Sequence, residues 1–86
     1  MERGIIKGLQ GSWGSGMAVL TVEVGGEDRR TFCENGPTVR ALDAAFGDAI
    51  GPGHTVNQAG FVGKEIVLQV DDMGLLESFA PAEEVI

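Results

Sequence analysis

The chain has a single cysteine, Cys33, and no tyrosine among its 86 residues. One cysteine excludes an intramolecular disulfide, which small secreted domains often need for stability. The first residues, Met-Glu-Arg-Gly, are not followed by a long apolar segment, so we expect no secretory signal peptide. No apolar run approaches the roughly 18 residues of a membrane-spanning helix. These absences lead us to expect a cytoplasmic protein that does not enter a membrane.

Basic residues are also scarce. Six Lys and Arg stand against 13 Asp and Glu, which gives a formal net charge of −7. Proteins that bind nucleic acids draw most of their affinity from Lys and Arg contacts with phosphates, so this balance disfavours a nucleic-acid partner. We expect a well-solvated surface, and a basic partner wherever charge contributes to binding.

Length and composition indicate one small globular domain. A content of 43 % hydrophobic and 22 % charged residues is close to that of globular proteins. Glycine is abundant, with 14 residues that follow no fixed period and interrupt the apolar runs, as in a chain with many tight turns. We expect residues 1–82 to form a single domain and residues 83–86 to form a frayed tail.

Alternation of apolar and polar residues over residues 17–24 predicts a half-buried strand. Its apolar face consists of Ala18, Leu20, Val22 and Val24. Glycines and acids at residues 25–28 predict a turn, and residues 29–34 predict the returning strand of a hairpin. In that strand Phe32 faces opposite to Thr31 and Cys33.

A first strand is predicted over residues 4–10, which are short and rich in β-branched side chains. Strict alternation places Ile5, Lys7 and Leu9 on one face of this strand and Ile6 on the other.

A second hairpin is predicted near the end of the sequence. Residues 64–70 and 75–80 form its strands, and the turn between them contains a glycine where a positive φ is needed. Pro81 ends the last strand, because proline cannot donate to the ladder. Ahead of this hairpin, residues 54–58 are predicted to form either a short strand or an ordered loop. Phe61 follows them, and we expect its side chain to fill the core.

Between the two hairpins the sequence predicts one amphipathic helix. Asn35-Gly36-Pro37 marks its start, since proline is tolerated in the first helical turn. Gly47 suits the left-handed residue beyond its end. The apolar stripe recurs at spacings of three and four and consists of Val39, Leu42 and Phe46. We expect this stripe to pack against a sheet or over the open end of a barrel.

The expected order is therefore three strands, one helix and two strands. This order resembles that of the OB fold, a five-stranded, partly open barrel, and the resemblance lies in the order of elements only. We predict a mainly β (α+β) fold: a small five-stranded OB-like barrel with one helix between strands 3 and 4. An SH3-like barrel or an α+β sandwich fits the same elements.

Residues suited to catalysis or metal binding are few and scattered. Cys33 and His54 are the only cysteine and the only histidine, and their spacing does not support a nucleophile–base pair. One Cys and one His cannot make a structural zinc site, and the acidic turn at residues 71–74 lacks the spaced acids of a calcium loop. The glycines of residues 11–16 are followed by a predicted strand, whereas the glycines of a phosphate-binding loop are followed by a lysine and a helix. We expect no catalytic residue, no metal and no cofactor.

The candidate binding residues are Trp13, Lys7, Arg29 and Arg30. Trp13 lies in a glycine–serine loop and either folds back onto the barrel or stays exposed as an anchor for a partner. With Phe32, these side chains would form a small stacking face of the kind that binds single strands on OB-type sheets. The double arginine also suits an edge strand that is charged to prevent aggregation.

Three classes of function follow from these observations. We expect a small non-enzymatic interaction module that binds a protein partner or its own copy, because no catalytic constellation is present. The alternative is an OB-like single-stranded nucleic-acid-binding domain, which rests on fold analogy alone. A second alternative is a small-ligand-binding protein or an enzyme.

Overall fold

A computed structural model describes residues 1–11 and 16–84 of the chain. The described residues form five strands and one α-helix: β1 (Glu2–Gly11), β2 (Met17–Val24), β3 (Glu27–Glu34), α1 (Asn35–Phe46), β4 (Glu65–Val70) and β5 (Leu76–Pro81). Short 3-10 turns occupy Pro52–His54, Gln58–Gly60 and Ala82–Glu84. The predicted mainly β fold, with its helix between the third and fourth strands, is confirmed.

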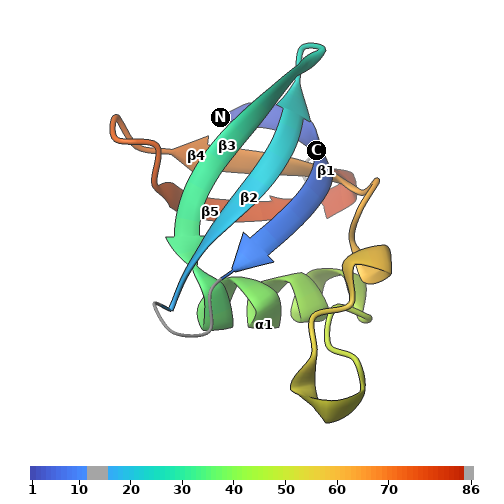
Figure 1. Cartoon of the computed structure of the whole chain (residues 1–86). Helices are drawn as coiled ribbons and strands as arrows, with labels where there is room; N and C mark the ends of the chain where they lie inside the picture. The colour runs from blue at the N-terminus through green and yellow to red at the C-terminus, as the bar shows by residue number, and fades with distance from the viewer. Residues whose placement is uncertain (12–15, 85–86) are drawn as a thin grey trace.

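All five strands belong to one antiparallel sheet in the order β3-β2-β1-β4-β5. In Figure 1, β1, β2 and β3 form the front layer, β4 and β5 cross behind it, and α1 covers one end. The central strand β1 joins the layers, since it pairs with β4 near its start and with β2 along most of its length. The sheet edges β3 and β5 meet, within the described ranges, at a single parallel bridge between Phe32 and Leu75. No continuous ladder closes the sheet there, so the element order of the predicted barrel is confirmed and its closure is not.

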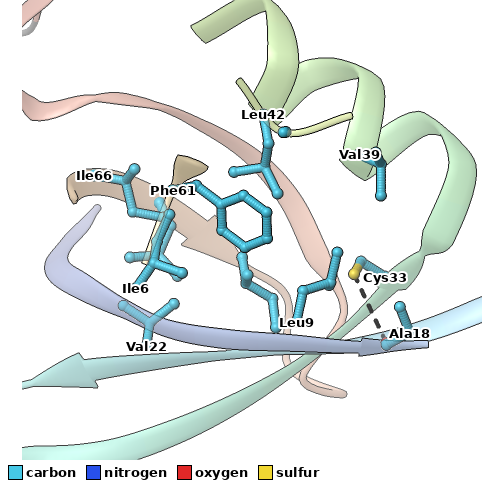
Figure 2. Close-up of a cluster of buried hydrophobic side chains, with 12 residues drawn as sticks. Ile6, Leu9, Ala18, Val22, Cys33, Val39, Leu42, Phe61 and Ile66 are labelled. Atoms are coloured by element: carbon cyan, nitrogen blue, oxygen red, sulfur yellow. Dashed lines mark hydrogen bonds between the residues drawn. The ribbon is translucent and has the colours of Figure 1, made fainter. Parts of the chain in front are cut away.

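Phe61 is the centre of the core, as predicted. Its side chain is fully buried, and Ile6, Ile66 and Leu42 surround its ring (Figure 2). Leu42 comes from the predicted apolar stripe of α1, which covers the open end of the sheet. The helix ends at Gly47, whose φ of 83° is the left-handed conformation expected there. No helix in residues 1–11 and 16–84 is long and apolar enough to cross a membrane.

The face assignment predicted for the first strand is wrong. Ile6 and Leu9 are both buried, whereas the side chain of Ile5 is 40 % exposed. The reason is a β-bulge: Ile6 pairs with Val22 and Gly8 pairs with Thr21, so Lys7 is the extra residue in β1. A bulge adds one residue to one strand, which reverses the alternation beyond it. The strand forms as predicted, but the alternation of buried and exposed residues after the bulge is shifted by one residue relative to that before it.

The segment between α1 and β4 is an ordered loop rather than a strand. Its only ladder contact among the described residues is an isolated bridge between Ile50 and Val56. The frayed tail is predicted over residues 83–86. Because residues 85–86 lie outside the described residues, the tail stays a prediction.

Candidate functional site

An exposed apolar surface lies on the outer face of β2 and β3, where they approach the β4–β5 turn. We call it the Phe32 face and define it as Met17, Val19, Phe32 and Leu75. Val19 lies directly opposite Phe32 in the β2–β3 ladder, and Met17 occupies the next outward position along β2. Leu75 is bridged to Phe32 from the other side. The Phe32 side chain is 47 % exposed, which is unusual for an aromatic ring in the middle of a ladder.

The backbone on both sides of Phe32 is fixed. One edge pairs with β2, and on the other edge the N–H of Phe32 donates to the carbonyl oxygen of Gly74 at 2.8 Å. A Cβ atom at Gly74 would lie 3.7 Å from Cδ2 of Phe32, so the ring lies against this glycine. The turn is held by Asp71, whose Oδ1 accepts hydrogen bonds from the N–H groups of Met73 and Leu75. The backbone of Phe32 is therefore held by neighbouring segments on both of its edges.

A shallow hollow of about 390 Å³ adjoins the Phe32 ring. Its walls come from β1, β2 and β3 and consist of Gln10, Gly11, Met17, Ala18, Val19 and Phe32. Small-molecule sites typically bury most of their ligand within about 300–1,000 Å³. This hollow lies on an open sheet face, so its form suits one side chain of a partner better than an enclosed ligand.

Acidic side chains flank the Phe32 face at both ends. Glu34 lies opposite Met17 in the ladder, and Asp71 and Asp72 precede Met73, which is 81 % exposed. Arg30 lies on the same outer face, two residues before Phe32. Acids therefore outnumber bases around this apolar surface, which favours a positively charged partner.

Lys7 and Arg30, two of the predicted binding residues, line one hollow of about 300 Å³ on the outer face. Lys7 projects from the bulge in β1, and its Nζ lies 3.3 Å from a carboxylate oxygen of Glu23. Asp28 lines the same hollow. Both positive charges thus have acidic neighbours, which lowers the attraction of this area for phosphate.

The other two predicted binding residues are placed differently. Arg29 points to the opposite face from Arg30, because it pairs with the buried Val22, and its guanidinium forms an ion pair with Glu2. Trp13 lies outside the described residues. The structure therefore brings Lys7 and Arg30 to one face with Phe32, and it places Arg29 elsewhere.

Cys33 is buried and faces the core from β3. Its thiol donates to the carbonyl oxygen of Ala18 at 3.7 Å (Figure 2). Burial raises the pKa of the Cys33 thiol, and hydrogen bonds from the Thr38 side chain and the Leu20 backbone oppose part of that rise. A buried thiol with a raised pKa is a poor nucleophile. Among the described side chains, no three His, Cys, Asp or Glu residues are grouped so as to hold a metal ion.

Met17, Val19 and Leu75 were not among the binding residues predicted from the sequence. The sequence did contain a signal for Phe32 itself, because alternation places Phe32 on the polar face of its hairpin. A large aromatic residue among polar face-mates such as Arg30 and Glu34 indicates an exposed ring. The contribution of Leu75 has no such signal, because it comes from a turn more than forty residues away along the chain.

The chain was compared with protein-family models, with curated proteins and with solved structures, and none of them matches it.

Proposed function

We propose that this protein is a small non-enzymatic interaction module that binds a protein partner through the Phe32 face. The observation that carries the proposal is the half-exposed ring of Phe32 on a strand fixed at both edges. Aromatic side chains bury a large area at little entropic cost, and they are enriched where binding energy concentrates. A ring held in place by the fold loses little further freedom on binding.

The charge around this face favours a basic partner over a second copy. Two copies would each bring a net charge of −7. They would also juxtapose Glu34, Asp71 and Asp72 with the same acids, which costs binding energy. A partner with an apolar anchor flanked by Lys or Arg avoids this repulsion and gains from the acidic rim. Such a complex forms more slowly as salt concentration rises.

The test compares three baits in affinity capture from cell extract: wild type, Phe32→Thr and Val62→Thr. Val62 is a matched control, because its side chain is 42 % exposed and lies outside the Phe32 face. We expect a basic protein that is held by wild type and by Val62→Thr but lost by Phe32→Thr. With the purified partner, the Kd should rise at least about tenfold for Phe32→Thr, as for a central interface aromatic.

Other outcomes identify other functions. Equal capture by all three baits would remove the Phe32 face as the binding site. A dimer of the wild type in sedimentation, abolished by Phe32→Thr, would make the partner a second copy. Circular dichroism should show all three proteins folded, since both substituted side chains are partly exposed.

Single-stranded nucleic acid is the second candidate, and one observation favours it. Lys7, Arg30 and Phe32 share the outer face of β1–β3, and the face of strands 2 and 3 is where OB folds bind oligonucleotides. Titration with oligo(dT) at low salt decides the matter, because low salt strengthens phosphate contacts. We expect no binding, since Glu23 and Asp28 lie beside both bases.

We propose that this module works in the cytoplasm. The single cysteine is a buried thiol with no second cysteine in the sequence to pair with, which suits a reducing compartment. Separate imaging of a tagged full-length chain tests this assignment.

A further inference from the structure

A groove separates β3 from β5 beyond the Phe32–Leu75 bridge. β3 continues through Cys33 and Glu34 into α1, whereas β5 continues from Leu76 beside β4. β3 pairs along its length with β2, and on its other edge the N–H of Phe32 already donates to the carbonyl oxygen of Gly74. Among the described residues, β5 has a ladder with β4 only. The edge of β5 that faces the groove therefore offers backbone N–H and C=O groups to an additional strand.

The groove has a volume of about 300 Å³ and is lined by β3, the first turns of α1 and β5. Its less exposed lining is mostly apolar and consists of the buried Cys33 and Thr38 and the partly buried Leu76 and Phe79. Its rim carries the exposed carboxylates of Glu34 and Glu77. Among the described lining residues there is no Lys and no Arg.

We propose that this groove accepts an extended, basic segment of a partner protein as an added strand along the edge of β5. The bridge between Phe32 and Leu75 is parallel, so the two flanking strands run in the same direction. A segment in the groove can run antiparallel to β5, which is the arrangement of every strand pair within this sheet. The added strand pairs with the edge of β5, which has no ladder partner among the described residues.

The alternation of an extended segment matches the two sides of the groove. Successive side chains of a strand point to opposite faces, so one set contacts the apolar floor and the other set points outward. Lysine or arginine side chains in the outward set reach Glu34 and Glu77 on the rim. A second copy of this chain is a poorer occupant, because it carries the same net charge of −7. The groove shares none of the four residues that define the Phe32 face, although Glu34 lies beside both. Occupation of the groove does not depend on the function proposed for that face.

Synthetic peptides test the proposal on the full chain. The probe is a capped six-residue peptide of alternating valine and lysine, with its binding followed by fluorescence anisotropy. One control peptide replaces lysine with glutamate, and another keeps lysine but carries an N-methyl group on every backbone amide. We expect only the unmethylated basic peptide to bind, because N-methylation removes the ladder hydrogen bonds and leaves the charge unchanged.

Hydrogen exchange locates the peptide on the protein. The bound peptide should slow exchange of backbone amides in residues 76–79 and leave the Phe32→Thr variant binding as tightly as wild type. Glu34→Gln and Glu77→Gln should each weaken binding by about two- to fivefold, as for exposed charge pairs, and the exposed Glu27→Gln should not.

Several results would overturn the proposal. Equal binding of the N-methylated peptide would show a charge contact without strand addition. Failure of the basic peptide to bind at millimolar concentration would show that the groove does not accept a strand. Concentration-dependent protection of residues 76–79 in the protein alone would identify a second copy as the occupant.

Discussion

The side-chain amide of Gln58 pairs with the backbone of Leu9 in both directions. The N–H of Leu9 donates to Oε1 of Gln58 at 2.9 Å, and Nε2 of Gln58 donates to the carbonyl oxygen of Leu9 at 2.5 Å. β1 pairs with β4 only as far as Ile5, so its edge needs other partners beyond that residue. Gln58 takes the place of a neighbouring strand there, and it ties the loop between α1 and β4 to the sheet.

We expect Gln58→Ala to lower the free energy of unfolding by about 1–2 kcal/mol, because two hydrogen bonds are lost and water replaces them only in part. Urea unfolding followed by circular dichroism measures the change. The matched control is Gln69→Ala, which removes an exposed glutamine of β4. A loss no larger for Gln58→Ala than for Gln69→Ala would show that the pairing with Leu9 adds no stability.

The bulge at Lys7 makes a prediction about alanine substitutions in β1. Ile6→Ala and Leu9→Ala should each destabilise the protein by about 2–5 kcal/mol, since both side chains are buried. Ile5→Ala should destabilise the protein less than either, because Ile5 lies on the exposed face of β1, just before the bulge. A strand with strict alternation would instead give similar losses for Ile5 and Leu9, and thermal unfolding of the three variants distinguishes the two cases.

Alanine substitutions at two glycines should change the free energy of unfolding in opposite directions. A Cβ atom at Gly60 would lie 1.9 Å from the carbonyl oxygen of Asp48, so the backbone must shift, and we expect a loss of at least about 2 kcal/mol. At Gly36, in the first turn of α1, the nearest atom is a side-chain nitrogen of Arg40 at 3.7 Å. Gly36→Ala should stabilise the protein by about 0.4–1 kcal/mol, because alanine restricts the unfolded chain. Chemical denaturation of both variants tests these signs.

The buried thiol of Cys33 predicts a loss of stability at alkaline pH. Burial, the largest cause, raises its pKa in the folded state, so the folded protein holds the proton more tightly than the unfolded chain does. The resulting stability is fully present below the pKa of an unfolded cysteine and is lost as pH rises through the folded pKa. Unfolding of wild type and Cys33→Ala should therefore be compared at neutral pH and at successively higher pH. We expect the stability advantage of wild type to shrink with rising pH, and a constant difference would contradict the buried titration.

The elements of this protein follow from its sequence to a large extent. The β2–β3 hairpin, the stripe of α1 and the position of Phe61 were predictable, because each depends on a pattern among residues close together in the chain. The exposed position of Phe32 was predictable for the same reason. Local alternation fixes which residues share a face wherever a strand is regular.

Three features depended on contacts between distant parts of the chain. The bulge at Lys7 changed the phase of β1, because this strand must bend to pair with both β2 and β4. The pairing of Gln58 with Leu9 joins residues 49 positions apart. The bridge from Phe32 to Leu75 completed the Phe32 face and set the end of the groove.

The sequence by itself thus determined a short acidic chain with two hairpins, one helix and an aromatic ring on a polar face. The tertiary structure alone decided which strand edges meet, which remain open and which apolar side chains join that ring. The physical reason is that side-chain periodicity is set by the backbone conformation of neighbouring residues. Strand adjacency is instead set by the burial of one common core, to which residues from the whole chain contribute.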